Sequence, residues 1–156
     1  MKYDFSTANL GKRLIKSPLS IKYFTDEKKR LLFNTYCHNY LSSTDKNGRP
    51  LSVELAGPRE KIFFNPPQTR AAIVTCGGLC PGINDVIRSI TTTLFFSYQV
   101  KNIIGIQYGL RGLNPHFGHT FIKLSPEVVK DIAEMGGSIL SMSRGPQDVN
   151  IMVDYL

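Results

Sequence analysis

The spacing of hydrophobic positions changes near the middle of the chain. Residues 71–75 form a continuous apolar run, which is typical of a strand covered on both faces. After a glycine-rich loop, hydrophobic residues recur at helical spacing and predict a helix. The side chains expected on its inward face are those of Val86, Ile87, Ile90 and Leu94. Its N-cap is expected at Asn84 or Asp85, because both side chains suit that position.

Further apolar runs follow at regular intervals. Residues 100–106 predict a second strand, 138–140 a third brief strand, and 120–124 a short strand or an edge segment. Strands that alternate with helices through short glycine turns indicate an α/β fold. We therefore predict a parallel sheet with flanking helices and right-handed crossovers.

A second helix is predicted after residue 124. Ser125-Pro126-Glu127 combines a good N-cap, a proline at the first helical position and an acidic side chain in the first turn. The inward side chains are expected to be those of Val128, Val129 and Ile132. Gly136-Gly137 is expected to end this helix, and a last helix is expected to begin within residues 147–149.

Residues 1–68 lack this alternation and are interpreted as an N-terminal arm, with residues 69–156 as a separate domain. Within the arm, residues 25–33 predict a short capped helix and residues 45–50 a turn. The arm holds 12 Lys and Arg against 6 Asp and Glu, whereas the domain holds 7 against 6. No nucleic-acid-binding motif accompanies these charges, so we interpret them as a solvated basic face.

Composition narrows the class of protein further. No run is long and apolar enough to span a bilayer, and residues 1–5 lack the apolar region of a signal peptide. The three cysteines, Cys37, Cys76 and Cys80, are too few for a disulfide framework. We therefore expect a cytoplasmic protein with neither a membrane nor a nucleic acid as its partner.

The loop between the first predicted strand and helix contains Gly77, Gly78 and Gly82. Their spacing differs from the dinucleotide pattern G-x-G-x-x-G. It matches the first half of a P-loop, but Ile83-Asn84 stands where Lys and Ser or Thr would follow. From the residues alone two interpretations remain. The glycines form only a turn, or their backbone N–H groups cradle a phosphate.

A basic side chain in a second loop favours the phosphate interpretation. Ligands of parallel sheets bind beyond the carboxyl ends of the strands, where residues 76–84 and 141–147 are expected to lie. Arg144 belongs to the second of these loops. A metal site is disfavoured, because the histidines lie elsewhere in the chain from Cys76 and Cys80. His116 and His119 are interpreted as ordinary loop residues.

Four ordered motifs resemble those of the 6-phosphofructokinases. Residues 75–88, Thr-Cys-Gly-Gly-Leu-Cys-Pro-Gly-Ile-Asn-Asp-Val-Ile-Arg, resemble the first phosphate loop of that family, most closely in the branch shared by plants, spirochaetes and other microbes. Residues 54–64 are similar to the lead-in of that branch, 105–113 to its second loop and 136–145 to its arginine loop. The resemblance covers residues 54–156 well and the arm loosely.

This resemblance implies a Rossmann-like N-terminal phosphofructokinase domain. It further implies an enzyme that transfers a phosphoryl group from ATP, with Mg²⁺, to fructose 6-phosphate in glycolysis. The implied binding roles place the Gly77 backbone and the Arg144 side chain on the donor phosphates, with Gly145 letting the nucleotide lie close. Gly78 and Tyr108 complete the expected cofactor-binding residues.

Several elements of the family have no counterpart before Leu156. They are the Gly-Gly-Asp loop that holds Mg²⁺, the loop with the catalytic aspartate and the sugar-phosphate site. We therefore expect no catalytic residue within this chain and no turnover by the chain alone. A pyrophosphate-dependent relative and a non-catalytic phosphate- or nucleotide-binding fragment remain as alternatives. The resemblance implies a homo-oligomer for the full-length protein.

Overall fold

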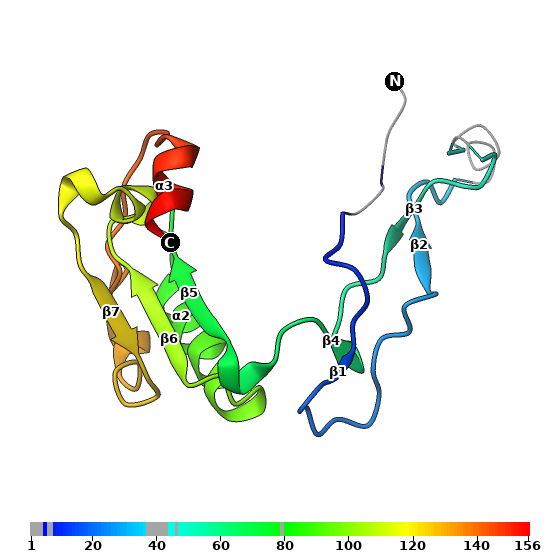
Figure 1. The fold of residues 1–156 in the computed structure, drawn as a ribbon, viewed down its shortest axis with the longest axis horizontal. Helices are drawn as coiled ribbons and strands as arrows, with labels where there is room; N and C mark the ends of the chain where they lie inside the picture. Colours follow the sequence, from blue (N-terminus) through cyan, green and yellow to red (C-terminus); the bar gives the residue numbers. More distant parts are fainter. Residues whose placement is uncertain (1–4, 6–7, 37–43, 46, 79) are drawn as a thin grey trace. The chain divides into compact units, whose positions relative to one another are not determined.

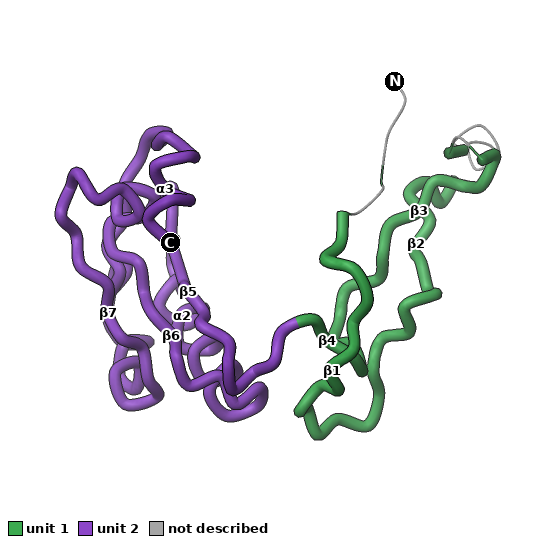
Figure 2. The backbone as a smooth tube through the Cα atoms, in the orientation of Figure 1, with its two compact units in different colours: residues 1–63 green, residues 64–156 purple. Residues whose placement is uncertain are grey.

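The structure is a computed structural model that describes residues 5, 8–36, 44–45, 47–78 and 80–156. The chain forms two compact units, residues 1–63 and residues 64–156 (Figure 2). Cys37 lies outside the described residues. Among the residues that are described, no helix is long and apolar enough to cross a bilayer.

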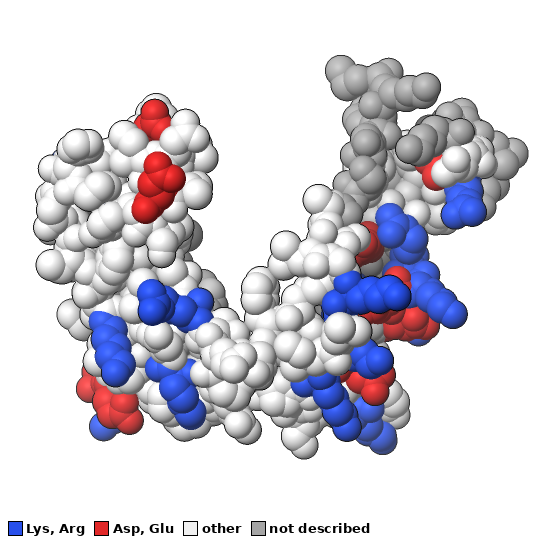
Figure 3. All heavy atoms as spheres, viewed as in Figure 1, with Lys and Arg blue, Asp and Glu red and all other residues white. Residues whose placement is uncertain are grey.

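Unit 1, residues 1–63, is built from two small antiparallel ribbons (Figure 1). Strand β1 (Ile15–Lys16) pairs with β4 (Lys61–Ile62), and β2 (Arg30–Leu32) pairs with β3 (Ser52–Glu54). Lys and Arg alternate with Asp and Glu on the face of this unit seen in Figure 3, so no continuous basic surface appears there.

The helix predicted at residues 25–33 is wrong, whereas the turn at 45–50 is confirmed. The Asp26 side chain accepts a hydrogen bond from the Lys28 N–H at 2.9 Å, and its carbonyl accepts one from Lys29 at 3.2 Å. This local turn competes with a helix, and the chain then enters β2. In the second turn, the Asp45 carboxylate accepts hydrogen bonds from the N–H groups of Asn47 and Arg49.

Unit 2, residues 64–156, is built on a three-stranded sheet in the order β5-β6-β7 (Figure 1). Strand β5 (Arg70–Val74) runs parallel to β6 (Asn102–Ile106), as predicted. Strand β7 (Phe121–Leu124) is antiparallel to β6, so the sheet is mixed and the prediction of a wholly parallel sheet is wrong. The physical reason lies in the connection between β6 and β7. It contains only the 3-10 turns η3 (Gly109–Leu113) and η4 (Pro115–Phe117), with no crossover helix that would bring the chain back in parallel.

The third strand predicted at residues 138–140 is also wrong, because this segment is a turn. The Ser138 hydroxyl accepts a hydrogen bond from the Leu140 N–H at 3.2 Å, and the Ser138 carbonyl accepts one from Ser141 at 3.0 Å. Leu140 is nevertheless fully buried, and its carbonyl accepts a hydrogen bond from the Tyr108 N–H at 2.8 Å. A backbone hydrogen bond therefore connects this segment to the residues that follow β6, but the segment does not join the sheet.

Helix α2 (Ile83–Thr92) follows the glycine loop and continues as the π-helical turn η2 (Thr93–Ser97). Its N-cap is Gly82 in the left-handed conformation, so the predicted caps at Asn84 and Asp85 are wrong. The Asn84 side chain points inward instead and is only 3% exposed. It donates a hydrogen bond to the Met135 carbonyl at 2.9 Å and accepts one from the Ile139 N–H at 3.0 Å.

The inward face of α2 was predicted only in part. Ile87 is fully buried and Leu94 packs against the core, but Val86 and Ile90 are exposed. The buried positions within α2 are those of Asn84, Ile87 and Thr91. Because the Asn84 amide binds backbone groups beyond the helix, that side of α2 faces inward and Val86 and Ile90 face outward.

The helix predicted after Ser125 forms only one turn and a later 3-10 turn, η5 (Ile132–Glu134). Its start was predicted correctly, because the Ser125 hydroxyl accepts a hydrogen bond from the Val128 N–H at 3.4 Å. Hydrogen bonding to the Ser125 hydroxyl, and to its own N–H, lowers the pKa of Glu127. Val129 is buried but Val128 is exposed. The adjacent β-branched residues Val128 and Val129 slightly lower the helix propensity of this segment.

The last helix, α3 (Val149–Tyr155), is confirmed. Asp148 caps it by accepting hydrogen bonds from the N–H groups of Asn150 at 2.8 Å and Ile151 at 3.4 Å. Unit 2 has a core between α2 and the sheet. Its buried members are Ile73, Ile87, Val100, Ile103, Leu124, Val129, Ile132 and Leu140. Val74 on edge strand β5 is 40% exposed, so the expected coverage of this strand on both faces is wrong within the described residues.

Candidate functional site

Three loops meet at the carboxyl ends of β5 and β6. They are residues 75–78 after β5, residues 108–109 after β6, and residues 141–145. Residues of the first and third loops both lie close to Gly109 of the second loop, which is buried and has a φ of +58°. A Cβ atom at this position would lie 3.1 Å from the Thr75 carbonyl oxygen and 3.2 Å from the Ser143 hydroxyl oxygen. Both distances are shorter than an ordinary van der Waals contact, so glycine is required here for space as well as for conformation.

Hydrogen bonds hold the three loops together. The Ser143 hydroxyl donates to the Tyr108 carbonyl at 2.5 Å, which ties the third loop to the second. The Thr75 hydroxyl donates to the Ser141 carbonyl at 3.3 Å, which ties the first loop to the third. The loop arrangement is therefore set by groups that are far apart in the sequence.

Arg144 lies against the glycine loop, although the segment before it is a turn and not the predicted strand. Its Nη2 atom is 3.3 Å from the position that a Cβ atom would occupy at Gly78. Arg144 is exposed, and its guanidinium forms no hydrogen bond or ion pair with the described residues. A guanidinium that no described residue engages, next to a glycine backbone, is available to bind an anion in a bidentate manner.

Gly77 and Gly145 both have a φ of +98°, which favours glycine. Among the described residues, no atom lies within 4 Å of a Cβ position at either glycine. The constraint at both residues therefore comes from the backbone conformation and not from crowding by the protein. The open space beside both glycines leaves room for a ligand to approach the backbone.

The first turn of α2 begins directly beyond the glycine loop. Its N-cap, Gly82, has a φ of +81° and an exposed surface. The first turn of a helix presents unpaired N–H groups and the positive end of the helix dipole. The loop, the helix start and Arg144 thus combine three kinds of group that favour a negative charge.

Tyr108 takes part in the junction through its backbone. Its φ of +59° is unusual for a residue with a side chain, and its ring stacks on that of His119 with the centroids 4.2 Å apart. The His119 ring also stacks on Phe117, over which the Arg111 guanidinium lies at 4.3 Å. His119 is therefore part of an aromatic stack beside the second loop, which the interpretation as an ordinary loop residue did not include.

Thr75, Gly109 and Ser143 were not among the predicted site residues. They join the loops, and no local pattern distinguishes them from other small or hydroxyl-bearing loop residues. Cys76 and Cys80 are free and exposed. In the part of the chain that the structure describes, no three His, Cys, Asp or Glu side chains gather in a way that would hold a metal ion.

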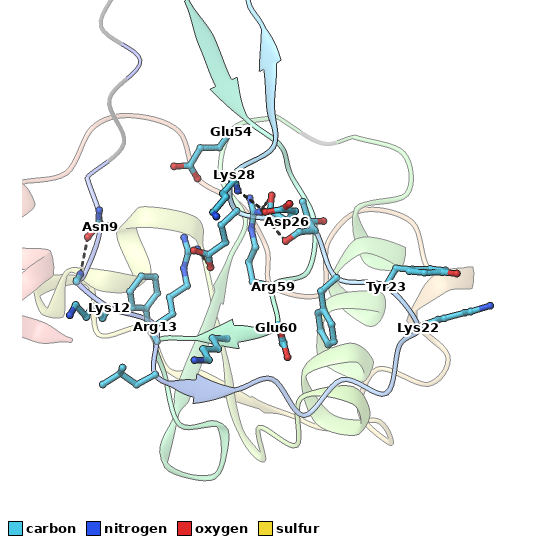
Figure 4. A pocket seen from close by; sticks show the side chains of 17 residues that line it. Asn9, Lys12, Arg13, Lys22, Tyr23, Asp26, Lys28, Glu54, Arg59 and Glu60 are labelled. Atoms are coloured by element: carbon cyan, nitrogen blue, oxygen red, sulfur yellow. Dashed lines mark hydrogen bonds and ion pairs between the residues drawn. The ribbon is translucent and has the colours of Figure 1, made fainter. Parts of the chain in front are cut away.

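A hollow in unit 1 has a different character (Figure 4). It has a volume of about 1070 Å³ and is lined entirely by residues of that unit. Arg13 is paired with Glu27 at 2.6 Å, and Arg59 donates hydrogen bonds to backbone carbonyls, including that of Leu55. Asp26, Glu27, Glu54 and Glu60 also line the hollow. Because its arginines are already engaged and acidic groups alternate with basic ones, it is a weaker anion site than the loops around Arg144.

Comparison with known proteins identifies the family. A model of the family described as "Phosphofructokinase" matches residues 70–154. An ATP-dependent 6-phosphofructokinase of Borreliella burgdorferi is 45% identical over 151 residues, which cover 91% of this chain and 33% of that protein. Proteins of the same name from Trypanosoma cruzi and Entamoeba histolytica are each 53% identical, over 69% and 67% of this chain and 22% and 24% of their own lengths.

The chain thus spans a third or less of the length of these relatives. The family match begins at the first residue of β5 and ends within α3, so it contains all three loops described above. The match also exceeds half of the chain. On this evidence the chain belongs to the phosphofructokinase family.

Proposed function

We propose that this protein forms the donor-phosphate side of an ATP-dependent 6-phosphofructokinase. The observation that carries the proposal is the position of the Arg144 guanidinium beside Gly78, at the carboxyl ends of a parallel strand pair and without a partner among the described residues. The names of the relatives support ATP as the phosphoryl donor. Fructose 6-phosphate is the proposed acceptor, and the full-length form is proposed to be a cytoplasmic homo-oligomer.

In this proposal the chain binds and orients the donor. The Arg144 guanidinium binds phosphate oxygens, while the backbones of Gly77, Gly78 and Gly145 allow the polyphosphate to approach closely. Tyr108 contributes at the edge of the nucleotide. Phosphoryl transfer depends mainly on positioning and on stabilising the charge that spreads over the phosphate oxygens. An arginine and backbone N–H groups supply both.

The three loops do not fit a Mg²⁺ site by themselves. Residues 75–78, 108–109 and 141–145 contain no Asp or Glu, and Mg²⁺ prefers carboxylate oxygens and water. Asp148, the nearest acidic residue in sequence to the third loop, already caps α3. We therefore assign no metal ligand to these loops, and we propose no catalytic residue within the described part of the chain.

The chain alone is expected to form no fructose 1,6-bisphosphate. The reason is that the loops bind phosphate but offer no group that would activate the sugar hydroxyl. A coupled assay of the purified 156-residue chain with ATP, Mg²⁺ and fructose 6-phosphate checks this expectation. Turnover at a rate typical of the family would show that the catalytic machinery is present after all.

A chimera tests the proposed function directly. Residues 70–154 replace the matching segment of the Borreliella burgdorferi enzyme, to which this chain is 45% identical. If the segment supplies a working donor site, the chimera keeps its kcat and its KM for ATP within about tenfold of the parent values. A folded chimera that still binds fructose 6-phosphate but does not use ATP would contradict the proposal. Replacing ATP by pyrophosphate in the same assay identifies the donor.

A further inference from the structure

In the part of the chain that the structure describes, no residue holds the Arg144 guanidinium. The structure shows no acceptor for it among the described residues, and the residue is exposed. A free arginine side chain samples many rotamers, and ordering it on a ligand costs entropy. Because no described residue holds the side chain itself, this entropic cost is reduced only by contacts that order the backbone of Arg144.

The backbone around Arg144 is anchored on both sides. On the N-terminal side, the Ser143 hydroxyl is bonded to the Tyr108 carbonyl at 2.5 Å. On the C-terminal side, Gln147 accepts a hydrogen bond from Asn114 at 3.1 Å. Gly145, with a φ of +98°, lies between Arg144 and the second anchor. The Ser143 hydrogen bond is therefore the anchor nearest to Arg144.

The position of Ser143 depends on the space left by Gly109. A Cβ atom at Gly109 would be 3.2 Å from the Ser143 hydroxyl and 3.1 Å from the Thr75 carbonyl. The flexible neighbour in this contact is Ser143, because the Thr75 oxygen belongs to the backbone. A side chain at position 109 would therefore displace Ser143 before it displaced the glycine loop.

We infer that Ser143 is a positioning residue that holds Arg144 against the glycine loop, and that Gly109 provides the space for it. The inference rests on the proposed function, because Arg144 is taken to bind the donor phosphates. Ser143 itself does not touch the donor. It acts by fixing the backbone from which the guanidinium reaches the phosphate, so its contribution exists only while Arg144 is present.

A double-mutant cycle in the full chain tests the inference, with the dissociation constant for ATP as the readout. We expect Ser143→Ala to weaken ATP binding about five- to tenfold and Ser143→Thr, which keeps the hydroxyl, to restore most of it. In an Arg144→Ala background, Ser143→Ala should change the constant less than about twofold. An equal loss in both backgrounds would overturn the inference, because Ser143 would then act on the fold and not through Arg144.

A second measurement does not depend on ATP. In NMR spectra of the ligand-free chain, the Arg144 guanidinium should show a nuclear Overhauser effect to the Gly78 backbone. This signal should be lost in Ser143→Ala and kept in Ser143→Thr. Its persistence in Ser143→Ala would refute the positioning role even if the chain binds no ATP. Absence of ATP binding by the unmutated chain, with the signal behaving as expected, would instead contradict the proposed function alone.

The role of Gly109 has a matched control in Gly118. Both glycines are left-handed, with φ of +58° and +63°, but only Gly109 is crowded, since nothing described lies within 4 Å of a Cβ at Gly118. Gly109→Ala should abolish the Arg144 to Gly78 signal, whereas Gly118→Ala should keep it. If both variants keep the signal, the space at Gly109 does not control Ser143.

Discussion

Replacing Arg144 with alanine is expected to weaken ATP binding about 10- to 150-fold. A charge-assisted hydrogen bond to a phosphate contributes about 1.5–3 kcal/mol, which corresponds to that range of dissociation constants. Arg144 is exposed and forms no ion pair with the described residues, so the substitution removes binding energy without breaking the fold. Arg144→Lys should be intermediate, because lysine keeps the charge but loses the planar fork. Titration calorimetry with ATP measures both effects.

Arg70→Ala is the matched control. Arg70 is also exposed, but it begins β5, at the end of the strand opposite to the glycine loop. The net charge changes equally in the two variants, so a non-specific electrostatic effect would appear in both. We expect Arg70→Ala to change the dissociation constant less than about twofold at physiological salt, where charges separated by more than about 8 Å are largely screened. If Arg144→Ala and Arg70→Ala weakened ATP binding equally, the result would contradict a specific role of Arg144.

Replacing Asn84 with alanine is expected to lower the free energy of unfolding of unit 2 by about 2–3 kcal/mol. The amide is 3% exposed and bonds both the Met135 carbonyl and the Ile139 N–H. Alanine would leave these backbone groups without a partner and remove the link between α2 and the segment that leads to Ser143. Urea denaturation followed through the amide NMR signals of β6 measures the change.

Arg88→Ala provides the comparison for Asn84. Arg88 lies on the same helix, is exposed and has no side-chain partner among the described residues. Surface substitutions of this kind change stability by no more than about 0.5 kcal/mol. A loss in Asn84→Ala as small as that in Arg88→Ala would mean that the two hydrogen bonds do not link α2 to residues 135–139.

Hydrophobic spacing was enough to predict the principal elements of unit 2. Strands β5 and β6, the edge strand β7 and helix α2 all lie where the apolar pattern placed them. The direction of β7 was not predictable in the same way. It depends on the connection after β6, in which glycine and proline favour 3-10 turns over a crossover helix.

Asn84 shows why the inward face of α2 was predicted only in part. A pattern of hydrophobic residues treats a polar side chain as outward-facing, and an asparagine near a helix start is usually a cap. Here its amide has two backbone partners about 50 residues later in the chain, and these partners make burial favourable. Partners so distant in sequence cannot be found from a local pattern.

The residues of the candidate site were also predictable from the sequence only in part. The loops of Arg144 and Gly78 were predicted to lie together, because each was expected to follow a strand of one parallel sheet. The two residues do lie close together, but residues 138–140 before the Arg144 loop form a turn and not a strand. Ser143 and Gly109 were missed because their importance arises from one contact between loops 34 residues apart in the numbering. Residue type is enough to identify a group that binds an anion, such as Arg144. The residues that hold this group in place are identified only from the packing of the folded chain.

Titration of the isotope-labelled chain with a non-hydrolysable ATP analogue tests the central claim most directly. Saturable changes in the amide signals of Gly77, Gly78 and Gly145, lost in Arg144→Ala and kept in Arg70→Ala, are the result that the donor-phosphate assignment predicts. Saturable changes confined to the hollow of unit 1, or no saturable change at millimolar analogue, would contradict it.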